Sequence, residues 1–166
     1  MNQKQLSNFN IKSTSRVATS WDKDLKETAL PMLKSHLEEI YGKRLENKEI
    51  FLLCLSFGFE EKHLGKIPPR KSDAVRLNYF DEREVAMMRS IALAHTNDFH
   101  ILIDEDAMYD IIEQYAAGGL ELLYVEIQNQ PNFQAWLISQ MTHRVSELRK
   151  ENQKANSLEI SPDRKY

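Results

Sequence analysis

Residues 81–123 constrain the fold of this chain more than any other part of the sequence. They contain two segments with helical spacing of apolar side chains, and each begins in a cluster of acids, at Asp81 and at Asp104. Acidic side chains at a helix N-terminus accept backbone N–H groups and complement the helix dipole. The first segment ends at the polar residues 96–98 and the second at the glycine pair 118–119, which tolerate a left-handed turn. The pattern predicts two antiparallel helices packed as a hairpin.

Two more helices are predicted before this hairpin. Residues 22–41 carry apolar side chains at spacings of three to five, interrupted by Pro31. The proline predicts either a kink or a short helix followed by a fresh start. Residues 48–57 are apolar on both faces and predict a largely buried helix, with Asn47 as its N-cap and Gly58 as a left-handed C-cap.

The C-terminal third of the chain predicts one short and one long helix. Residues 120–127 form a further short helix, or continue the second hairpin helix through a kink at the glycine pair. A long helix is predicted at about 131–152, with Pro131 in its first turn. Its apolar stripe either packs on the rest of its own chain or forms a seam for a partner. The candidates for partner binding on this helix are Phe133, Trp136 and Met141.

The helical pattern fails between residues 60 and 80, which predicts a long loop stiffened by the proline pair 68–69. Residues 75–79 alternate apolar and polar side chains, which indicates a short extended piece. A stiff basic loop binds an anion or an acidic partner with little loss of entropy, although it is also typical of a solubilising loop over a core. The candidate residues for binding a partner or DNA are Lys62, Lys66, Arg70, Lys71 and Arg76.

Size and composition favour a single domain of the all-α class. The chain has 166 residues, 42% of them apolar, with only five glycines and five prolines, so it can bury a sizeable core in long elements. We expect a single compact helical domain of five to six helices, with a long extended loop and a long C-terminal helix. Its predicted limits are residues 21–152, between a flexible polar arm at 1–20 and a flexible tail at 153–166.

Cysteine usage and hydropathy indicate a cytoplasmic protein. Cys54 is the single cysteine, so an internal disulfide is impossible, and it is expected to be a small buried core residue. The polar first 20 residues contain no apolar core of a secretory signal, and no stretch approaches the ~20 apolar residues that span a bilayer. We therefore expect no membrane association.

The net charge of −3 is unevenly distributed. Residues 81–126 hold eleven acids and two bases, a net charge of −9, whereas residues 2–16, 60–76 and 143–166 carry +3, +2 and +2. An acidic surface repels a phosphate backbone. DNA binding by the helical body is therefore disfavoured and is left to the basic arm, loop and tail.

The chain shows no clear metal site. His95, Asp98 and His100 lie within six residues, but they straddle a turn and their spacing matches none of the usual zinc patterns. The acids at 104–110 lack the turn glycine and the closing glutamate of a calcium loop, and helix capping explains them. We expect no metal.

Catalytic motifs are equally hard to find. Asp110 and Glu113 would share a helix face as paired carboxylates, but solvation is the more common reason for such a pair. Neither a glycine-rich nucleotide motif nor a nucleophile elbow is present. We assign no catalytic residue and no cofactor.

Three strings of residues resemble a known family. Residues 51–59 (FLLCLSFGF) are followed by Ile67-Pro68, then by residues 89–98 (RSIALAHTND) and 113–123 (EQYAAGGLELL). In order and approximate spacing, over about residues 47–126, they resemble the fourth type of Dnd-system-associated protein. This small bacterial family is encoded beside the Dnd genes, which serve DNA phosphorothioation and the restriction linked to it. The helix after Pro131 and the N-terminal arm lie outside the likeness.

The resemblance implies a bacterial cytoplasmic accessory protein of an anti-phage defence system and carries over no catalytic residue. Our first hypothesis is a non-enzymatic adaptor that binds another protein of the same operon through the basic loop or the C-terminal helix. The alternative is a DNA-binding or sensor module that uses the arm, loop and tail. A third, an enzyme with unrecognised chemistry, requires a polar cleft around Glu113, His95 or His100. The oligomeric state is not predicted.

Overall fold

The computed structural model describes residues 16–18, 23–67 and 74–159 of the chain. The fold is all-α, as predicted, with five α-helices in the described residues and one small two-stranded sheet. The chain divides into two compact units, residues 1–129 and 130–166, which are described separately below. The predicted division into arm, domain and tail stays a prediction, because much of the arm and of the tail lies outside the described residues.

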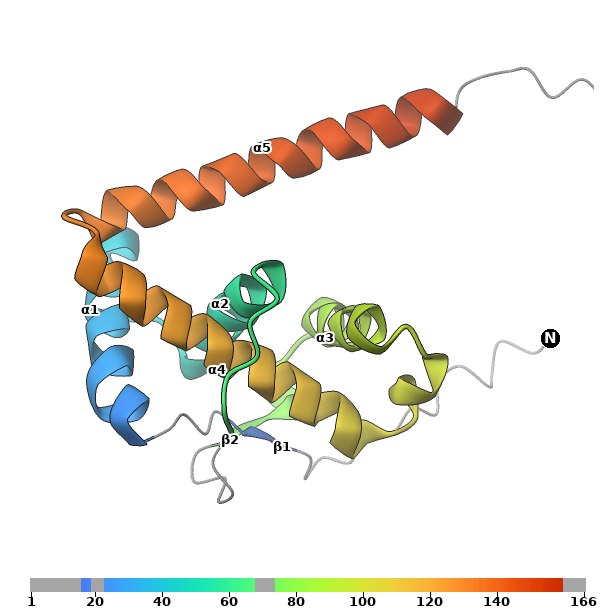
Figure 1. The fold of residues 1–166 in the computed structure, drawn as a ribbon, viewed down its shortest axis with the longest axis horizontal. Helices are drawn as coiled ribbons and strands as arrows, with labels where there is room; N and C mark the ends of the chain where they lie inside the picture. Colours follow the sequence, from blue (N-terminus) through green and yellow to red (C-terminus); the bar gives the residue numbers. More distant parts are fainter. Residues whose placement is uncertain (1–15, 19–22, 68–73, 160–166) are drawn as a thin grey trace, which may run out of the picture. The chain divides into compact units, whose positions relative to one another are not determined.

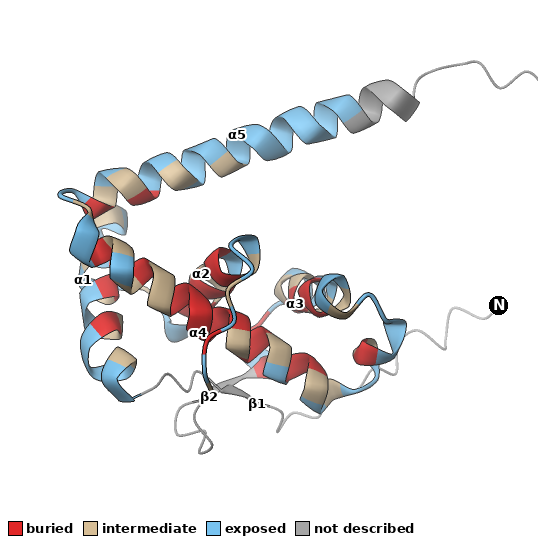
Figure 2. Cartoon of the chain, viewed as in Figure 1, coloured by how far each residue is buried: buried red, intermediate tan, exposed pale blue. Residues whose placement is uncertain are grey.

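Helix α4 (Glu105–Asn129) is the central element of the first unit. It contacts α1 (Leu30–Tyr41), α2 (Asn47–Glu60) and α3 (Glu82–Thr96), and in Figure 1 it crosses the face of α2. Figure 2 shows α4 as the most continuously buried helix. A helix covered by protein on several sides must be apolar around most of its circumference, which the sequence of α4 provides.

A π-helical turn at Leu25–Ala29 leads directly into α1. Pro31 stands in the first turn of α1, directly after the π-helical turn. The backbone N–H of Leu30 donates to the carbonyl of Leu25, five residues back. The chain stays helical without a break from residue 23 to residue 41, so the predicted fresh start at the proline does not occur, and the proline is accommodated by a change of helix type.

The N-cap of α2 is Glu46, so the prediction of Asn47 was wrong by one residue. Glu46 has an extended backbone, and its side chain and that of Glu49 each accept the other residue's backbone N–H in a capping box. Asn47 is the first helical residue, and its Oδ1 accepts from Lys34 Nζ at 3.1 Å. A glutamate at the N-cap is uncommon, which explains why the sequence pointed to its neighbour.

The acidic caps of the predicted hairpin are confirmed. Asp81 Oδ1 accepts the backbone N–H groups of Arg83 and Glu84 at 2.8 Å, and these two bonds hold the pKa of Asp81 below its ordinary value. Helix α3 ends at Asn97 in a left-handed conformation. Asp104 Oδ1 accepts from Ala107 N at 3.1 Å at the start of α4.

The glycine pair 118–119 does not break the second hairpin helix. Helix α4 is continuous through it, as in the alternative that joined 120–127 to this helix. A Cβ atom on Gly119 would overlap the carbonyl oxygen of Cys54 and approach Gly58 N to 2.9 Å. Gly119 therefore lets the backbones of α2 and α4 approach closely, and the flexibility of the glycine pair is not used for a turn.

Gly58 serves the same close contact from the side of α2. Its Cβ would overlap the carbonyl oxygen of Tyr115 and lie 2.9 Å from Gly119 N. The prediction that Gly58 ends the helix was therefore wrong, because α2 continues to Glu60. A left-handed backbone follows at Lys62, which has a φ of 53°.

The small sheet consists of β1 (Arg16–Ala18) and β2 (Ala74–Arg76), paired antiparallel. Strand β2 confirms the extended piece predicted there, but the chain turns into a 3-10 helix at Leu77–Tyr79, earlier than the alternation suggested. Strand β1 falls within residues 1–20, which were predicted to be a flexible arm. Three residues without strong periodicity gave no signal for this pairing.

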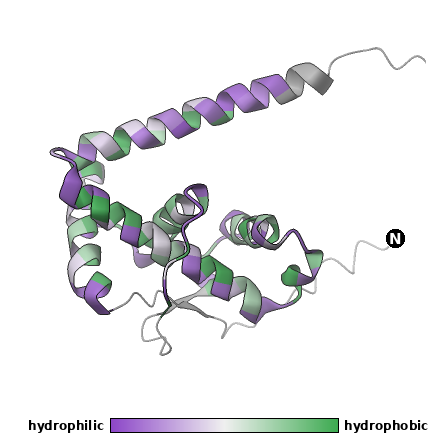
Figure 3. Cartoon of the chain, viewed as in Figure 1, coloured by the Kyte–Doolittle hydropathy of each residue, from purple (hydrophilic) through white to green (hydrophobic). Residues whose placement is uncertain are grey.

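The second unit contains α5 (Phe133–Glu159). Asn132 caps the N-terminus of this helix, since Asn132 Oδ1 accepts from Ala135 N at 2.9 Å. The helix continues seven residues beyond the predicted end at residue 152, because residues 153–159 contain no glycine or proline to stop it. Figure 3 shows α5 as largely hydrophilic, in contrast to α4.

Candidate functional site

The segment that follows α2 is fixed against α4 through its backbone. Gly65 N donates to the carbonyl of Gln114 at 2.8 Å, and a Cβ on Gly118 would lie 2.9 Å from Gly65 N. His63 N donates to Gly58 O at 2.9 Å. Residues 61–67 therefore form an ordered connection, although the sequence predicted a loop without helical pattern there.

A side-chain contact adds to this anchoring. His63 Nε2 lies 2.8 Å from Glu121 Oε2, and both side chains are partly exposed, at 43% and 34%. A hydrogen bond at the edge of a helix pair is weaker than a buried one, because solvent competes for both groups. The contact orients the segment but does not create an enclosed site.

The structure describes the side chains of only two of the five residues in the predicted basic site. Lys62 and Lys66 are exposed on the anchored segment. Arg70 and Lys71 lie outside the described residues, and Arg76 belongs to β2, where only the backbone is described. The five basic residues therefore stay a prediction as a set.

The connection between α3 and α4 exposes two large apolar side chains. Phe99 and Ile103 are 75% and 72% exposed; Phe99 begins a short 3-10 helix at Phe99–Leu102, and Ile103 directly follows it. Asp98, Asp104 and Asp106 in the same stretch are also exposed. We call residues 98–106 the acidic tip.

The acidic tip is held by hydrogen bonds and by one buried residue. Asp98 Oδ1 accepts from the backbone N–H of His100 at 2.9 Å and lies 2.8 Å from His100 Nδ1. The backbone bond and the side-chain bond from His100 lower the pKa of Asp98. Ile101 is buried between the exposed Phe99 and Ile103. The sequence showed an apolar run here but gave no sign that its ends face solvent, because exposure depends on which elements cover the run.

The candidate metal residues do not converge. His95 Nδ1 lies 2.9 Å from the hydroxyl of Tyr115, whereas Asp98 and His100 pair with each other. Among the described residues, no group of three or more His, Cys, Asp and Glu side chains is arranged to hold a metal ion.

The carboxylate pair on α4 is divided between core and surface. Asp110 is exposed, but Glu113 is only 3% exposed. The expectation that both are solvated was therefore wrong for Glu113. The cause is that residues 112–120 of α4 are buried almost throughout, so a side chain at position 113 is covered whatever its polarity.

The one thiol of the chain is inert. Cys54 is fully buried at the contact of α2 with α4, and removal from water raises the pKa of its thiol well above the ordinary value. A thiol with a raised pKa supplies little thiolate, which is the nucleophilic form. The prediction of a small buried core residue is confirmed.

Helix α5 has a buried start and an exposed remainder. Phe133 is 3% exposed and stacks on Trp136 with ring centroids 5.6 Å apart, and Leu137 is 1% exposed. Met141 is 37% exposed. Of the three candidates for partner binding on this helix, Met141 is thus the one with an exposed side chain, while Trp136 is half-buried.

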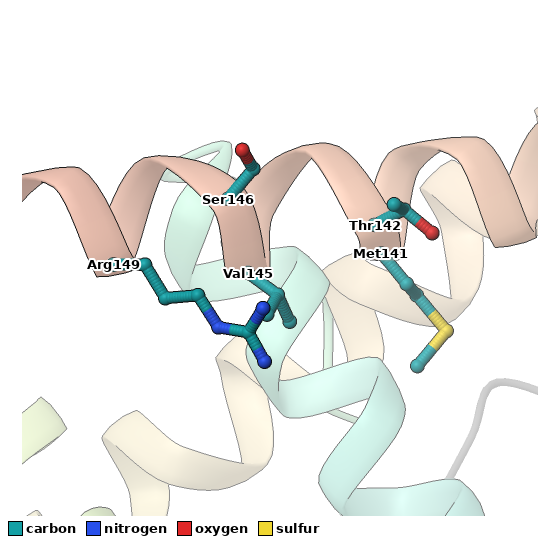
Figure 4. A pocket seen from close by; sticks show the side chains of 5 residues that line it. All are labelled: Met141, Thr142, Val145, Ser146 and Arg149. Atoms are coloured by element: carbon teal, nitrogen blue, oxygen red, sulfur yellow. The ribbon is translucent and has the colours of Figure 1, made fainter.

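Four exposed apolar side chains follow one another along α5. We call them the α5 stripe: Ile138, Met141, Val145 and Leu148. Figure 4 shows Met141 and Val145 beside the polar residues that line the same hollow, Thr142, Ser146 and Arg149. All five lining residues come from α5, so within this unit the hollow is an open helix face.

None of the described helices combines the length and the apolar composition needed to cross a bilayer.

A comparison with protein families decides the relationship of the chain. The family described as DNA sulphur modification system-associated protein 4 matches residues 32–160. The chain belongs to this family. No curated protein and no solved structure shows significant similarity to it.

The family match is longer than the resemblance seen in the sequence. The likeness was placed at residues 47–126 with the C-terminal helix outside it, but the match includes nearly all of α1 and α5. Helix α5 is therefore a family element and not an addition to this member. Membership of DNA sulphur modification system-associated protein 4 links the chain to such a system.

Proposed function

We propose that this protein is a non-catalytic adaptor of a DNA sulphur modification system. It binds another protein of that system through the acidic tip and acts in the cytoplasm. The family match supports the link to the system. The observation that carries the proposal is the exposure of Phe99 and Ile103, which at 75% and 72% are the most exposed of the large apolar side chains described.

The chemistry of the acidic tip indicates the kind of surface that it fits. A large aromatic and a β-branched side chain lose their water contacts when they enter an apolar pocket, and such residues supply much of the affinity of an interface. Asp98, Asp104 and Asp106 surround them with negative charge. The partner surface is therefore an apolar pocket with a basic rim.

The geometry of the acidic tip lowers the entropic cost of binding. Ile101 is buried, Asp98 caps the 3-10 helix and Asp104 caps α4, so both ends of the tip are held in the free protein. A surface that is ordered before association loses less conformational entropy when it binds.

Affinity capture from cells that carry the sulphur modification genes tests this proposal. The full-length protein is tagged and compared with Phe99→Ala/Ile103→Ala. We expect the unaltered protein to retain a product of those genes and the double variant to lose it. Because both side chains are mostly exposed, the double variant should keep its fold, which circular dichroism verifies.

Tyr79→Ala is the matched control, because Tyr79 is also a large side chain and is 60% exposed outside the acidic tip. This variant should capture the same protein as the unaltered chain. If the unaltered chain captures no product of the sulphur modification genes, or if Tyr79→Ala and the double variant behave alike, the proposal is wrong.

DNA binding is a second candidate, favoured by the anchored segment that presents Lys62 and Lys66. The hydrogen bond from Gly65 to Gln114 fixes both lysines close to α4 before any ligand arrives. Each phosphate contact contributes to a steep dependence of affinity on salt. We expect Lys62→Ala/Lys66→Ala to weaken retention on duplex DNA and to reduce its salt dependence, as should Arg70→Ala/Lys71→Ala. Equal retention of these variants and the unaltered protein at each salt concentration would exclude this mode.

A further inference from the structure

The α5 stripe has the spacing of a coiled-coil seam. Ile138, Met141, Val145 and Leu148 follow one another at intervals of three, four and three residues. Their side chains are 51%, 37%, 47% and 59% exposed. Apolar residues in this alternation occupy the two core positions of a heptad repeat, where they pack against a second helix. The stripe is thus a surface suited to another helix.

Two identical α5 helices can pair in parallel or antiparallel orientation, and the charged residues beside the stripe favour one of the two. In a parallel pair, the residue before one core position faces the residue that follows the next core position of the other helix. Arg144 of one copy would then face Arg149 of the other, and the two like charges repel each other. The parallel arrangement is therefore disfavoured.

In an antiparallel pair, opposite charges face each other instead of like charges. When Val145 of one copy packs against Leu148 of the second, the next layer places Met141 against Asn152. Arg144 lies between Met141 and Val145, and Glu151 of the other copy lies between the same two layers. Each Arg144 then faces a Glu151, so two opposite-charge pairs flank the apolar centre.

We propose that α5 pairs in antiparallel order with α5 of a second copy of this chain, with Val145 and Leu148 at the centre. The pairing buries the exposed stripe and places opposite charges next to each other at its edge. It is independent of the acidic tip, and it gives a dimer with two such tips.

Sedimentation of the full-length protein over a range of concentrations tests the pairing. We expect a monomer–dimer equilibrium that Leu148→Glu shifts to monomer, because a charge is then placed at the centre of the seam. Arg144→Glu and Glu151→Arg should each raise the dissociation constant about tenfold, since each introduces two like-charge contacts. The double variant Arg144→Glu/Glu151→Arg restores opposite charges at both contacts and should recover the dimer.

Engineered cysteines test the orientation. In the antiparallel pair, position 145 faces position 148, so Val145→Cys/Leu148→Cys should form an intermolecular disulfide on mild oxidation. Leu148→Cys alone should form it poorly, because the two copies of position 148 are then apart. Cys54 is buried and does not compete. Efficient cross-linking of Leu148→Cys alone, a monomer at every concentration, or failure of the double charge reversal to recover the dimer would overturn the proposal.

Discussion

Single residues set the ends of the helices in this protein, and the sequence revealed many of them. Asp81 and Asp104 were predicted because a cap depends only on neighbours within a few residues. Glu46 was missed in favour of Asn47, although the difference is one position. Glu113 was misjudged for another reason, since its burial depends on the elements that cover α4 and not on its neighbours in sequence.

The cap at Asp81 predicts a dependence of stability on pH. Its folded-state pKa is lowered, chiefly by the backbone N–H of Glu84, so its ionised form favours folding. That contribution is complete above the unfolded-state pKa near 4 and is lost as pH falls through the lower folded-state value. We expect Asp81→Asn to flatten the fall of the unfolding free energy between about pH 5 and pH 2, measured by denaturant titration.

The control for this measurement is Glu82→Gln, which removes the same charge from the next residue of the same helix turn. It should leave more of the acid dependence in place than Asp81→Asn does. If the unfolding free energy fell equally steeply with pH in the two variants, the general charge of α3, and not the cap, would determine the loss of stability in acid.

At the scale of elements, the contact of α2 with α4 organises the first unit, and glycines make it possible. The sequence showed the glycines but not their role, because a glycine pair in a helical pattern is typical of both a break and a close helix contact. Which of these two roles a glycine has depends on the backbone that lies opposite it. Here the carbonyl of Cys54 lies against Gly119, and the carbonyl of Tyr115 lies against Gly58. Helix types and most boundaries were predictable, since apolar spacing is local.

The close contact of α2 with α4 predicts that a single added methyl group strongly lowers the unfolding free energy. Gly119→Ala would place its Cβ onto the backbone of α2, which cannot move aside without separating the helices. We expect it to lower the unfolding free energy by about 3 kcal/mol or more, as measured by denaturant titration.

Gly42→Ala is the comparison, because Gly42 ends α1 at a φ of 65° with nothing within 4 Å of an added Cβ. It should cost only about 1 kcal/mol, from the left-handed backbone alone. If Gly119→Ala were no more destabilising than Gly42→Ala, the helices would not be as close as described.

At the scale of the whole molecule, this family member has two units and two surfaces with different chemistry. The sequence predicted the all-α class and a C-terminal helix that packs either on its own chain or on a partner. It placed the main candidate site, however, on the basic residues. It gave no indication of the acidic tip, because Phe99 and Ile103 resemble core residues until the fold leaves them uncovered.

The two surfaces predict separable effects. Leu148→Glu should abolish self-association and leave capture of the system's protein by the acidic tip detectable. Phe99→Ala/Ile103→Ala should do the reverse, with a normal sedimentation profile and no capture. Loss of both properties in either variant would indicate one shared surface instead of two.

Calorimetric titration of the purified, full-length protein with the captured protein of the sulphur modification system measures whether the acidic tip is the binding surface. We expect Phe99→Ala/Ile103→Ala to raise the dissociation constant at least about tenfold, whereas Tyr79→Ala should change it little. Equal affinities for the unaltered protein and the Phe99→Ala/Ile103→Ala variant would contradict this expectation.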